Sequence, residues 1–389
     1  MKSNYKRLGE YIEFLDARAL SYESILDLDS IKGISSIYKE FIKTKANLIG
    51  VVADNYKVVE KGSFAYNPNT ARMGDKIPIA LNQFDYPVLV STIYPTFKIK
   101  YLEKLIPEYL MMWFRRPEFD RYARFMSHGS AREVFDIEEM NGVMLPVPHP
   151  DKQKEIVKEY NTILNRIALN NQLIQKLEET AQAIYKQWFV DFEFPNEEGK
   201  PYKSSGGEME SEIPVGWEMR PIGKVCEIKA GGDKPTIYSE VKTSNCSVPI
   251  FSNGITDDGL YGYTNKANYP KNSITISARG TIGFSVLRNE AFDAIVRLLV
   301  LIPKQDFSAI YFWQAIRKME FDDSGSVQNQ LTVPQVSVLN ILLPSQNVLR
   351  NYDSILRLIY NKIEIYRIEN SKLSQMKNLL LSKLATIEN

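Results

Sequence analysis

Two stretches of the chain repeat apolar residues at alternating spacings of four and three residues. The first runs from Ile156 to Trp188 and the second from Tyr352 to Leu384, with Lys, Glu, Gln and Asn at most of the positions between. A spacing that averages 3.5 residues and is sustained over more than four heptads is typical of a coiled-coil helix. We therefore expect two long helices. Two unrelated amphipathic helices, each packed on its own domain, are the alternative.

Each helix carries one Asn at a core position of its apolar pattern, Asn170 in the first and Asn370 in the second. If the helices run antiparallel with partner numbers that sum to 540, these two residues meet and Trp188 faces Tyr352. A buried Asn costs stability but fixes the register, because a slip leaves its amide in hydrocarbon. We predict an intramolecular antiparallel pair whose register is set by Asn170 and Asn370. The same register places Lys377 at a core position, from which its ammonium group must extend outward.

The chain also repeats itself at an offset of 196 residues. Residues 129–148 align without gaps with 325–344, and the apolar phase continues into the two helices. Before each repeated block, short apolar runs bounded by turn residues predict strands, with one helical stretch in each half. The sequence thus predicts an α+β protein with two repeated mixed α/β domains, separated by two long helices that form an antiparallel coiled coil.

The predicted boundaries follow from these patterns and from a Gly-, Pro- and Ser-rich polar stretch between the two copies. They are 1–151 for the first domain, 152–190 for the central helix, 191–215 for the linker, 216–346 for the second domain and 347–389 for the C-terminal helix.

Composition limits the classes of function. Lys and Arg number 48 against 47 Asp and Glu in 389 residues, so the net charge is +1 and any DNA contact must come from local patches. Only two Cys and two His are present, so a disulfide framework or a zinc site is not expected, and a reducing compartment fits. No apolar stretch resembles a signal peptide or a transmembrane helix, so we expect a cytoplasmic protein with no membrane contact.

The junction between the first helix and the second domain carries a recognisable motif. Residues 188–192 read Trp-Phe-Val-Asp-Phe, and 212–217 read Glu-Ile-Pro-Val-Gly-Trp before Ile222-Gly223. This motif, with the duplicated block that leads into a long helix, resembles the specificity (S) subunits of type I restriction–modification systems. The resemblance covers essentially the whole chain.

The resemblance implies a non-catalytic role in DNA recognition. Each mixed domain would be a target-recognition domain that reads one half of a bipartite, asymmetric site in double-stranded DNA. The helices would set the spacer between the halves and dock two methyltransferase (M) subunits, which recruit two restriction (R) subunits. No cofactor is expected in this chain, because S-adenosylmethionine, ATP and magnesium would belong to the partner subunits.

Two alternatives to this function are an enzyme and a protein-binding scaffold. An amino-methyltransferase needs an Asn/Asp-Pro-Pro-Tyr/Phe element, and the nearest string, at 67–70, lacks the second Pro and the aromatic residue. No phosphate-binding Gly-x-x-x-x-Gly-Lys-Ser/Thr motif occurs either. The remaining alternative is a non-catalytic coiled-coil scaffold that binds proteins rather than DNA. Specific DNA binding that requires the methyltransferase partner would exclude it.

Candidate DNA contacts were chosen as Arg, Asn, Gln, Ser and Tyr residues in turn-rich segments, since these side chains read base edges and phosphates. Arg279 is the first candidate, because 277–283 is similar to a recurrent loop of these domains; a surface arginine in a hairpin is the alternative. Trp113 and Phe114 are expected in a helix core rather than stacked on a base. The predicted contacts are Tyr66, Asn67, Arg72, Ser130, Arg132, Ser252, Asn253, Tyr261, Tyr263, Arg279, Gly280, Gln328 and Asn329.

Overall fold

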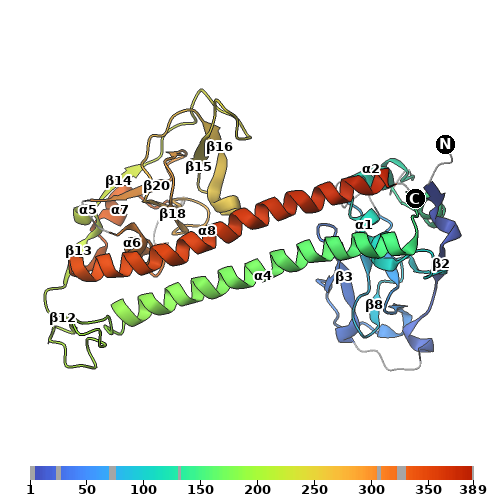
Figure 1. Ribbon diagram of the computed structural model, residues 1–389, viewed down its shortest axis with the longest axis horizontal. Helices are drawn as coiled ribbons and strands as arrows, with labels where there is room; N and C mark the ends of the chain where they lie inside the picture. The colour runs from blue at the N-terminus through green and yellow to red at the C-terminus, as the bar shows by residue number, and fades with distance from the viewer. Residues whose placement is uncertain are drawn as a thin grey trace. The chain divides into compact units, whose positions relative to one another are not determined.

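The protein divides into two compact units, seen in a computed structural model (Figure 1). The first unit comprises Met1–Asn170 and Ile368–Asn389, and the second comprises Asn171–Arg367. Each unit therefore combines one mixed domain with a part of both long helices. The structure describes residues 5–22, 28–69, 76–129, 133–304, 308–321 and 330–387.

Among the described residues, the domain of the first unit is built from short, mostly antiparallel strands and three α-helices. Its main sheet has the strand order β2 (Ile12–Leu15), β9 (Thr96–Ile99), β6 (Phe64–Tyr66) and β7 (Ile79–Leu81). Two-stranded pairs add β1 (Tyr5–Arg7) with β10 (Met144–Pro146), β3 (Lys32–Ile34) with β4 (Phe41–Lys43), and β5 (Lys57–Val59) with β8 (Val88–Val90). The helices are α1 (Pro107–Phe114), α2 (Pro117–Phe125) and α3 (Ile137–Gly142).

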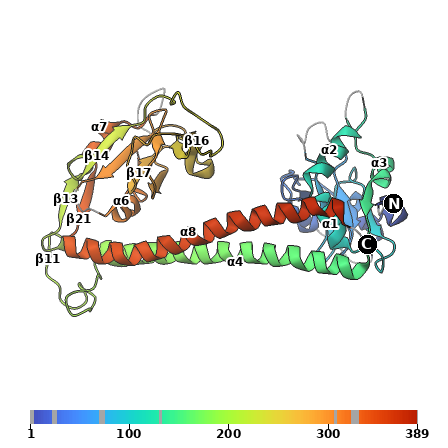
Figure 2. The same ribbon diagram turned by 45° about the horizontal axis from the view of Figure 1, so that its top comes forward.

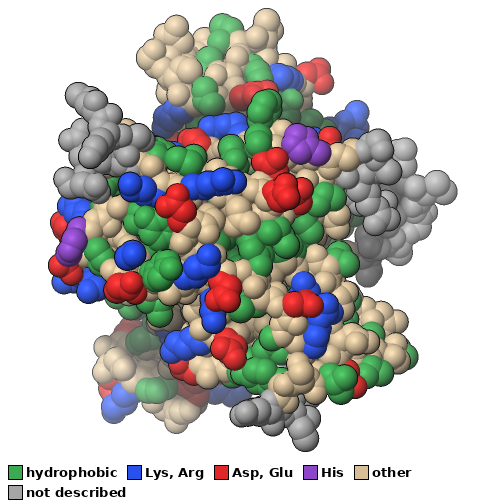
Figure 3. All heavy atoms as spheres, turned by 90° about the vertical axis from the view of Figure 1, so that its right-hand side faces the viewer, with side chains coloured by type: hydrophobic (Ala, Val, Ile, Leu, Met, Phe, Trp, Pro, Cys, Tyr) green, Lys and Arg blue, Asp and Glu red, His purple; other side chains and the backbone are tan. Residues whose placement is uncertain are grey.

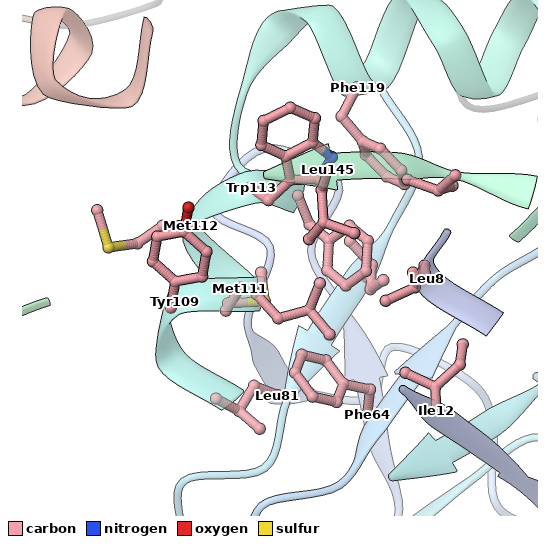
Figure 4. Close-up of a cluster of buried hydrophobic side chains, with 14 of the residues drawn as sticks. Leu8, Ile12, Phe64, Leu81, Tyr109, Met111, Met112, Trp113, Phe119 and Leu145 are labelled. Carbon is pink, nitrogen blue, oxygen red and sulfur yellow. The ribbon is translucent and has the colours of Figure 1, made fainter. Parts of the chain in front are cut away.

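The core of this unit lies between α1 and the main sheet (Figure 4). Phe64 of β6 stacks on Phe97 of β9 with ring centroids 4.9 Å apart, and Phe114 of α1 meets Phe64 edge-on. Trp113 is 6% exposed and Phe114 is fully buried, so the prediction that these two residues belong to a helix core is confirmed. Both α1 and α2 begin at a proline, whose fixed φ suits the first helical turn.

Among the described residues, the domain of the second unit has one four-stranded and one three-stranded sheet. One has the order β14 (Cys226–Ala230), β20 (Leu299–Pro303), β17 (Ser273–Ile276) and β18 (Ser285–Arg288), and α6 (Ala309–Ile316) packs on its last three strands (Figure 2). The other has the order β16 (Leu260–Thr264), β15 (Val248–Phe251) and β19 (Asp293–Ala294), with β15 and β19 parallel. The remaining elements are β11 (Met209–Glu210) paired with β12 (Ile213–Pro214), β13 (Glu218–Pro221) paired with β21 (Asn340–Leu343), α5 (Ile222–Val225) and α7 (Val333–Val338).

The sequence repeat is visible in the structure as a repeated helix cap. In the first unit, the Asp136 side chain accepts a hydrogen bond from the backbone N–H of Glu139 at the start of α3. In the second unit, 196 residues later, Thr332 is the N-cap of α7, and its backbone N–H donates to Gln335 Oε1 at 2.9 Å. Such caps satisfy backbone groups that the helix leaves unpaired. The duplication therefore includes the local signals that start each helix.

The predicted helix register is confirmed in each unit by itself. The two long helices are α4 (Pro150–Phe189) and α8 (Gln346–Lys383). In the first unit, Asn170 Nδ2 donates to Asn370 Oδ1 at 2.9 Å, and Asn170 has no exposed surface. In the second unit, the rings of Trp188 and Tyr352 pack with centroids 5.6 Å apart. Both contacts have partner numbers that sum to 540, so the helices pair antiparallel in the expected register.

The segment 191–215, predicted as a linker, is part of the second unit and packs against the domain that follows it. Phe194 is 5% exposed and stacks between Trp217 and Tyr202, with ring centroids 5.0 Å and 4.5 Å away. Aromatic residues interleaved with the polar ones hold this segment on the domain, which composition alone does not indicate.

No helix among the described residues is long and apolar enough to cross a membrane. Within the same residues, no three His, Cys, Asp or Glu side chains are grouped as ligands of a metal ion.

Candidate nucleic-acid interface

Arg279 lies at the exposed tip of the hairpin that connects β17 and β18. The hairpin closes through the backbone N–H of Ser277, which donates to the Phe284 carbonyl at 2.8 Å. Gly280 has a φ of 72°, a left-handed conformation that glycine adopts without strain. The Arg279 guanidinium donates to Gln330 Oε1 at 2.7 Å, so its direction is partly fixed while the rest of the group faces solvent.

Asn253 joins this hairpin to two other loops. Its Oδ1 accepts a hydrogen bond from the backbone N–H of Ala278 at 2.7 Å, and its Nδ2 donates to the Val296 carbonyl at 2.8 Å. The Asn253 side chain therefore ties loop 252–254 to the loop that carries Arg279 and to the loop 295–297. This bridge gives Asn253 a positioning role in the unbound chain.

The third loop presents Arg297, which is not among the contacts predicted from the sequence. Val296 and Arg297 have φ values of 53° and 59°, and left-handed backbone is unfavourable for a β-branched residue. Their N–H groups donate to the carbonyls of Gly232 and Gly231, which hold the strained turn in place. Arg297 is exposed. One signal was present in the sequence, because Arg297 interrupts the most apolar run of the chain.

An aromatic and cationic cluster follows on the neighbouring strand. Tyr261, 43% exposed, lies at the β-bulge between β15 and β16, and its ring is 5.6 Å from that of Tyr238. Lys234 Nζ is 3.5 Å from the Tyr238 ring centroid and 5.3 Å from that of Tyr261. A cation over two half-exposed rings offers both charge and a stacking surface. Lys234 and Tyr238 are not among the predicted contacts either, because only the fold brings them to Tyr261.

These groups form what we call the recognition face, defined by Lys234, Asn253, Tyr261, Arg279 and Arg297. Loop 295–297 connects its parts, because it bonds both to Asn253 and to Gly231-Gly232, two residues before Lys234. The structure thus brings together several of the predicted residues of the second domain. Two further predicted residues, Ser252 and Tyr263, are half-buried beside this face.

Arg288 supports the recognition face from below and is not part of it. Its side chain is 5% exposed, lies 3.6 Å above the Phe251 ring centroid, and donates to Thr275 Oγ1 and the Asp258 carbonyl. Burial lowers the pKa of Arg288 to about 10. It remains a cation at neutral pH, held inside the domain beneath the hairpin.

The predicted DNA contacts of the first unit that the structure describes are buried. Tyr66 is fully buried in β6 between β9 and β7, so the prediction that it contacts DNA is corrected to a core role. Asn67 is 5% exposed, and its Oδ1 accepts a hydrogen bond from the Asn69 N–H, so this side chain holds a turn. Five further predicted contacts lie outside the described residues: Arg72, Ser130, Arg132, Gln328 and Asn329.

Comparison with known proteins identifies the family. Residues 214–375 match the family model described as "Type I restriction modification DNA specificity domain". A putative type I specificity subunit of Mycoplasma pneumoniae, S.MpnORF89P, is 30% identical over 179 residues, which cover 46% of this chain and 48% of that one. The chain therefore spans about half the length of this relative.

Other matches extend the same relation. The specificity subunit of the Methanocaldococcus jannaschii type I enzyme MjaIX is 24% identical over 72% of this chain and 68% of that one. The putative M. pneumoniae subunit S.MpnORF289P C-terminus is 34% identical over 25% of this chain and 68% of its own length.

The fold has a solved counterpart. The crystal structure of a type I S subunit from M. genitalium covers 99% of this chain and 96% of its own, with a TM-score of 0.62 and 14% identity. The chain belongs to the family of type I restriction–modification specificity subunits.

Proposed function

We propose that this chain selects the DNA sequence for a type I restriction–modification complex. Each mixed domain reads one half of a bipartite site, and the paired helices set the spacer and dock the methyltransferase subunits. The observation that carries the proposal is the recognition face. There the Asn253 side chain joins three loops, two of which present Arg279 and Arg297, and the same face carries Lys234 over the rings of Tyr238 and Tyr261. A bidentate contact from Arg or Lys to guanine is the commonest specific contact in the major groove.

The two half-sites should differ in sequence. The repeat preserves the scaffold, including the caps of α3 and α7, but the surrounding strands differ. The second unit contains the parallel pair of β15 and β19, whereas the first unit has the small pairs β3–β4 and β5–β8. The loops that connect these different strands differ as well. Because contacts to bases come from such loops, we expect the two halves of the DNA site to differ in sequence.

The chemistry would belong to other subunits. The sequence carries no amino-methyltransferase motif and no phosphate-binding loop, so this chain would hold no cofactor. Two methyltransferase subunits would supply S-adenosylmethionine chemistry, and two restriction subunits would use ATP and magnesium. The complex would act in the cytoplasm, where the two unpaired thiols, Cys226 and Cys246, are compatible with reducing conditions.

The test is to co-express the chain with its methyltransferase subunit and to map modified adenines across the host genome by single-molecule sequencing. A split motif with a fixed spacer is expected. Arg279→Ala should relax one half of the motif, whereas Arg220→Ala, an exposed arginine paired with Glu218 on β13, should leave both halves unchanged. A soluble complex that methylates nothing would favour the protein-binding scaffold instead.

A further inference from the structure

The first unit contains a groove of about 940 Å³ between the β3–β4 turn, helix α2 and the two long helices. We call it the basic groove and define it by Tyr38, Lys76, Arg121, Arg124, Phe125 and Lys377, which line it. None of these residues was selected from the sequence as a DNA contact.

The lining of the basic groove has a large excess of positive charge. Among the described residues, six basic and two acidic side chains line it. Both acidic side chains are already engaged within the lining, since Asp120 accepts from Lys39 at 2.6 Å and Glu40 pairs with Arg115 at 3.2 Å. Lys76 and Lys377 add positive charge to the lining beyond these pairs, and so does Arg121, whose guanidinium lies 3.4 Å from Glu118 outside the lining. A protein with a net charge of +1 therefore concentrates cations here.

One wall of the groove is fixed by a buried ion pair. Lys39, 4% exposed and with a left-handed φ of 54°, inserts its ammonium group between Asp120 Oδ1 and the Phe114 carbonyl. Burial lowers the pKa of Lys39 and raises that of Asp120, so desolvation opposes the pair and the close contacts hold it. This contact attaches the β3–β4 turn to the junction of α1 and α2.

The rim of the groove is exposed and partly aromatic. Phe125 is 82% exposed and Tyr38 is 69% exposed, while Lys76 and Arg121 are also at the surface. Rings can pack on deoxyribose, and a Tyr hydroxyl and basic side chains can donate to phosphate oxygens. Figure 3 draws a face of the molecule on which basic and acidic side chains are interspersed.

The groove lies close in the sequence to two predicted contacts of the first domain. Lys76 comes four residues after Arg72, and Phe125 comes five residues before Ser130. Arg72 and Ser130 themselves lie outside the described residues. Chain order thus places cations of the groove next to segments that the sequence predicts to contact DNA.

Lys377 supplies an independent argument. It occupies a core position of the coiled-coil pattern, where its repeat equivalent in α4 is Ala181, which is fully buried. A lysine at such a position lowers coiled-coil stability. Its half-buried side chain lines the groove together with Tyr160 and Leu164. The methylene groups of Lys377 can therefore pack on the helices while its ammonium group adds positive charge to the groove.

We propose that the basic groove binds the sugar–phosphate backbone of duplex DNA beside the first half-site, independently of base sequence. This inference rests on the proposed function and assigns a separate task to the first unit. The groove anchors the duplex, and loops elsewhere read its bases.

The test uses Lys76→Gln/Arg121→Gln in the full chain, assembled with its methyltransferase subunit. Binding is measured by fluorescence anisotropy at several salt concentrations, on a duplex that carries the mapped motif and on a scrambled duplex. Removing two phosphate contacts should lower the slope of log K against log salt by about 1.8 in magnitude. If the variant and the wild type bind equally at 1 M salt, this change in slope weakens binding at 0.15 M by roughly 30-fold on both duplexes.

The matched control is Lys61→Gln/Lys98→Gln, which removes two exposed lysines of the same unit outside the groove, each paired with a carboxylate as Arg121 is with Glu118. Its salt slope should stay near that of the wild type. An equal loss in this control, an unchanged slope in the groove variant, or a loss confined to the motif duplex overturns the inference. Loss of the methyltransferase subunit from the groove variant does so too, because the groove would then dock protein.

Lys377→Met is a second variant, which should raise stability and weaken DNA binding. It should raise the melting temperature, since an apolar residue suits the coiled-coil position, and it should lower the salt slope by about 0.9. A higher melting temperature with an unchanged slope would contradict the inference. If the wild-type complex does not discriminate between the two duplexes, the proposed function fails, whatever the groove variants do.

Discussion

The two units build a groove at the same place in the repeat but give it different charge. In the second unit a groove of about 770 Å³ is lined by Tyr360, whose repeat equivalent, Leu164, lines the basic groove of the first. Four basic and five acidic side chains line it among the described residues, against six and two in the first unit. The same scaffold therefore carries a nearly neutral joint in one copy and a strongly basic surface in the other.

In the second groove, charged and polar side chains are engaged in contacts with each other. Arg367 pairs with Glu178 at 3.1 Å, and Tyr360 accepts a hydrogen bond from Gln314 and packs against Trp313. Burial raises the pKa of Tyr360 to about 12, as for a tyrosine that belongs to the packing of the domain. Duplication thus preserved the geometry while the side chains diverged, and charge distinguishes an anchoring surface from a structural joint.

The largest expected effect concerns the buried pair that fixes the wall of the basic groove. Lys39→Met leaves Asp120 buried without its cation, which should lower the free energy of unfolding by about 3–5 kcal/mol in urea titrations. Adding Asp120→Asn should recover part of the loss. In the second unit, Arg367→Gln breaks an exposed pair and should cost less than about 1 kcal/mol. Equal losses in the two units would contradict the comparison.

The next effect concerns base reading by the second unit. Arg279→Ala should weaken binding to the motif duplex by about 1–3 kcal/mol and relax one half-site, while the scrambled duplex is bound as before. A uniform loss on both duplexes would mark Arg279 as a phosphate contact. Base recognition by the second unit and backbone binding by the basic groove would then no longer be distinct functions.

A smaller effect is expected where the two long helices meet in the first unit. Asn170→Leu combined with Asn370→Leu should raise the free energy of unfolding by about 1 kcal/mol and loosen the register. Register can be followed by cross-linking between cysteines placed at paired positions. A stability loss would show that the amide pair contributes more than it costs.

The smallest effect tests the correction of Tyr66. Its buried hydroxyl has no hydrogen-bond partner among the described residues, so Tyr66→Phe should leave stability unchanged or raise it by up to about 1 kcal/mol. The methylation motif should be unaffected. A changed motif would return Tyr66 to the set of DNA contacts.

The sequence predicted those features whose causes are local or periodic. The register at Asn170 follows from a pattern along the helix itself, and the cap at Asp136 is set by residues within one turn. Burial of Tyr66 depends on strand pairing with distant residues, and the strained turn at Arg297 depends on carbonyls of another loop. The basic groove was not predictable, because it gathers residues as far apart as Tyr38 and Lys377.

The most direct test of the claim that the basic groove binds the DNA backbone while other loops read the bases compares three duplexes. One has both half-sites intact, one has the first scrambled and one has the second scrambled. The affinity of each is measured for the wild-type complex and for Lys76→Gln/Arg121→Gln. We predict that the variant loses the same factor, roughly 30-fold at 0.15 M salt, on all three. A loss that disappears when the first half-site is scrambled would contradict the account, because the groove would then be reading bases.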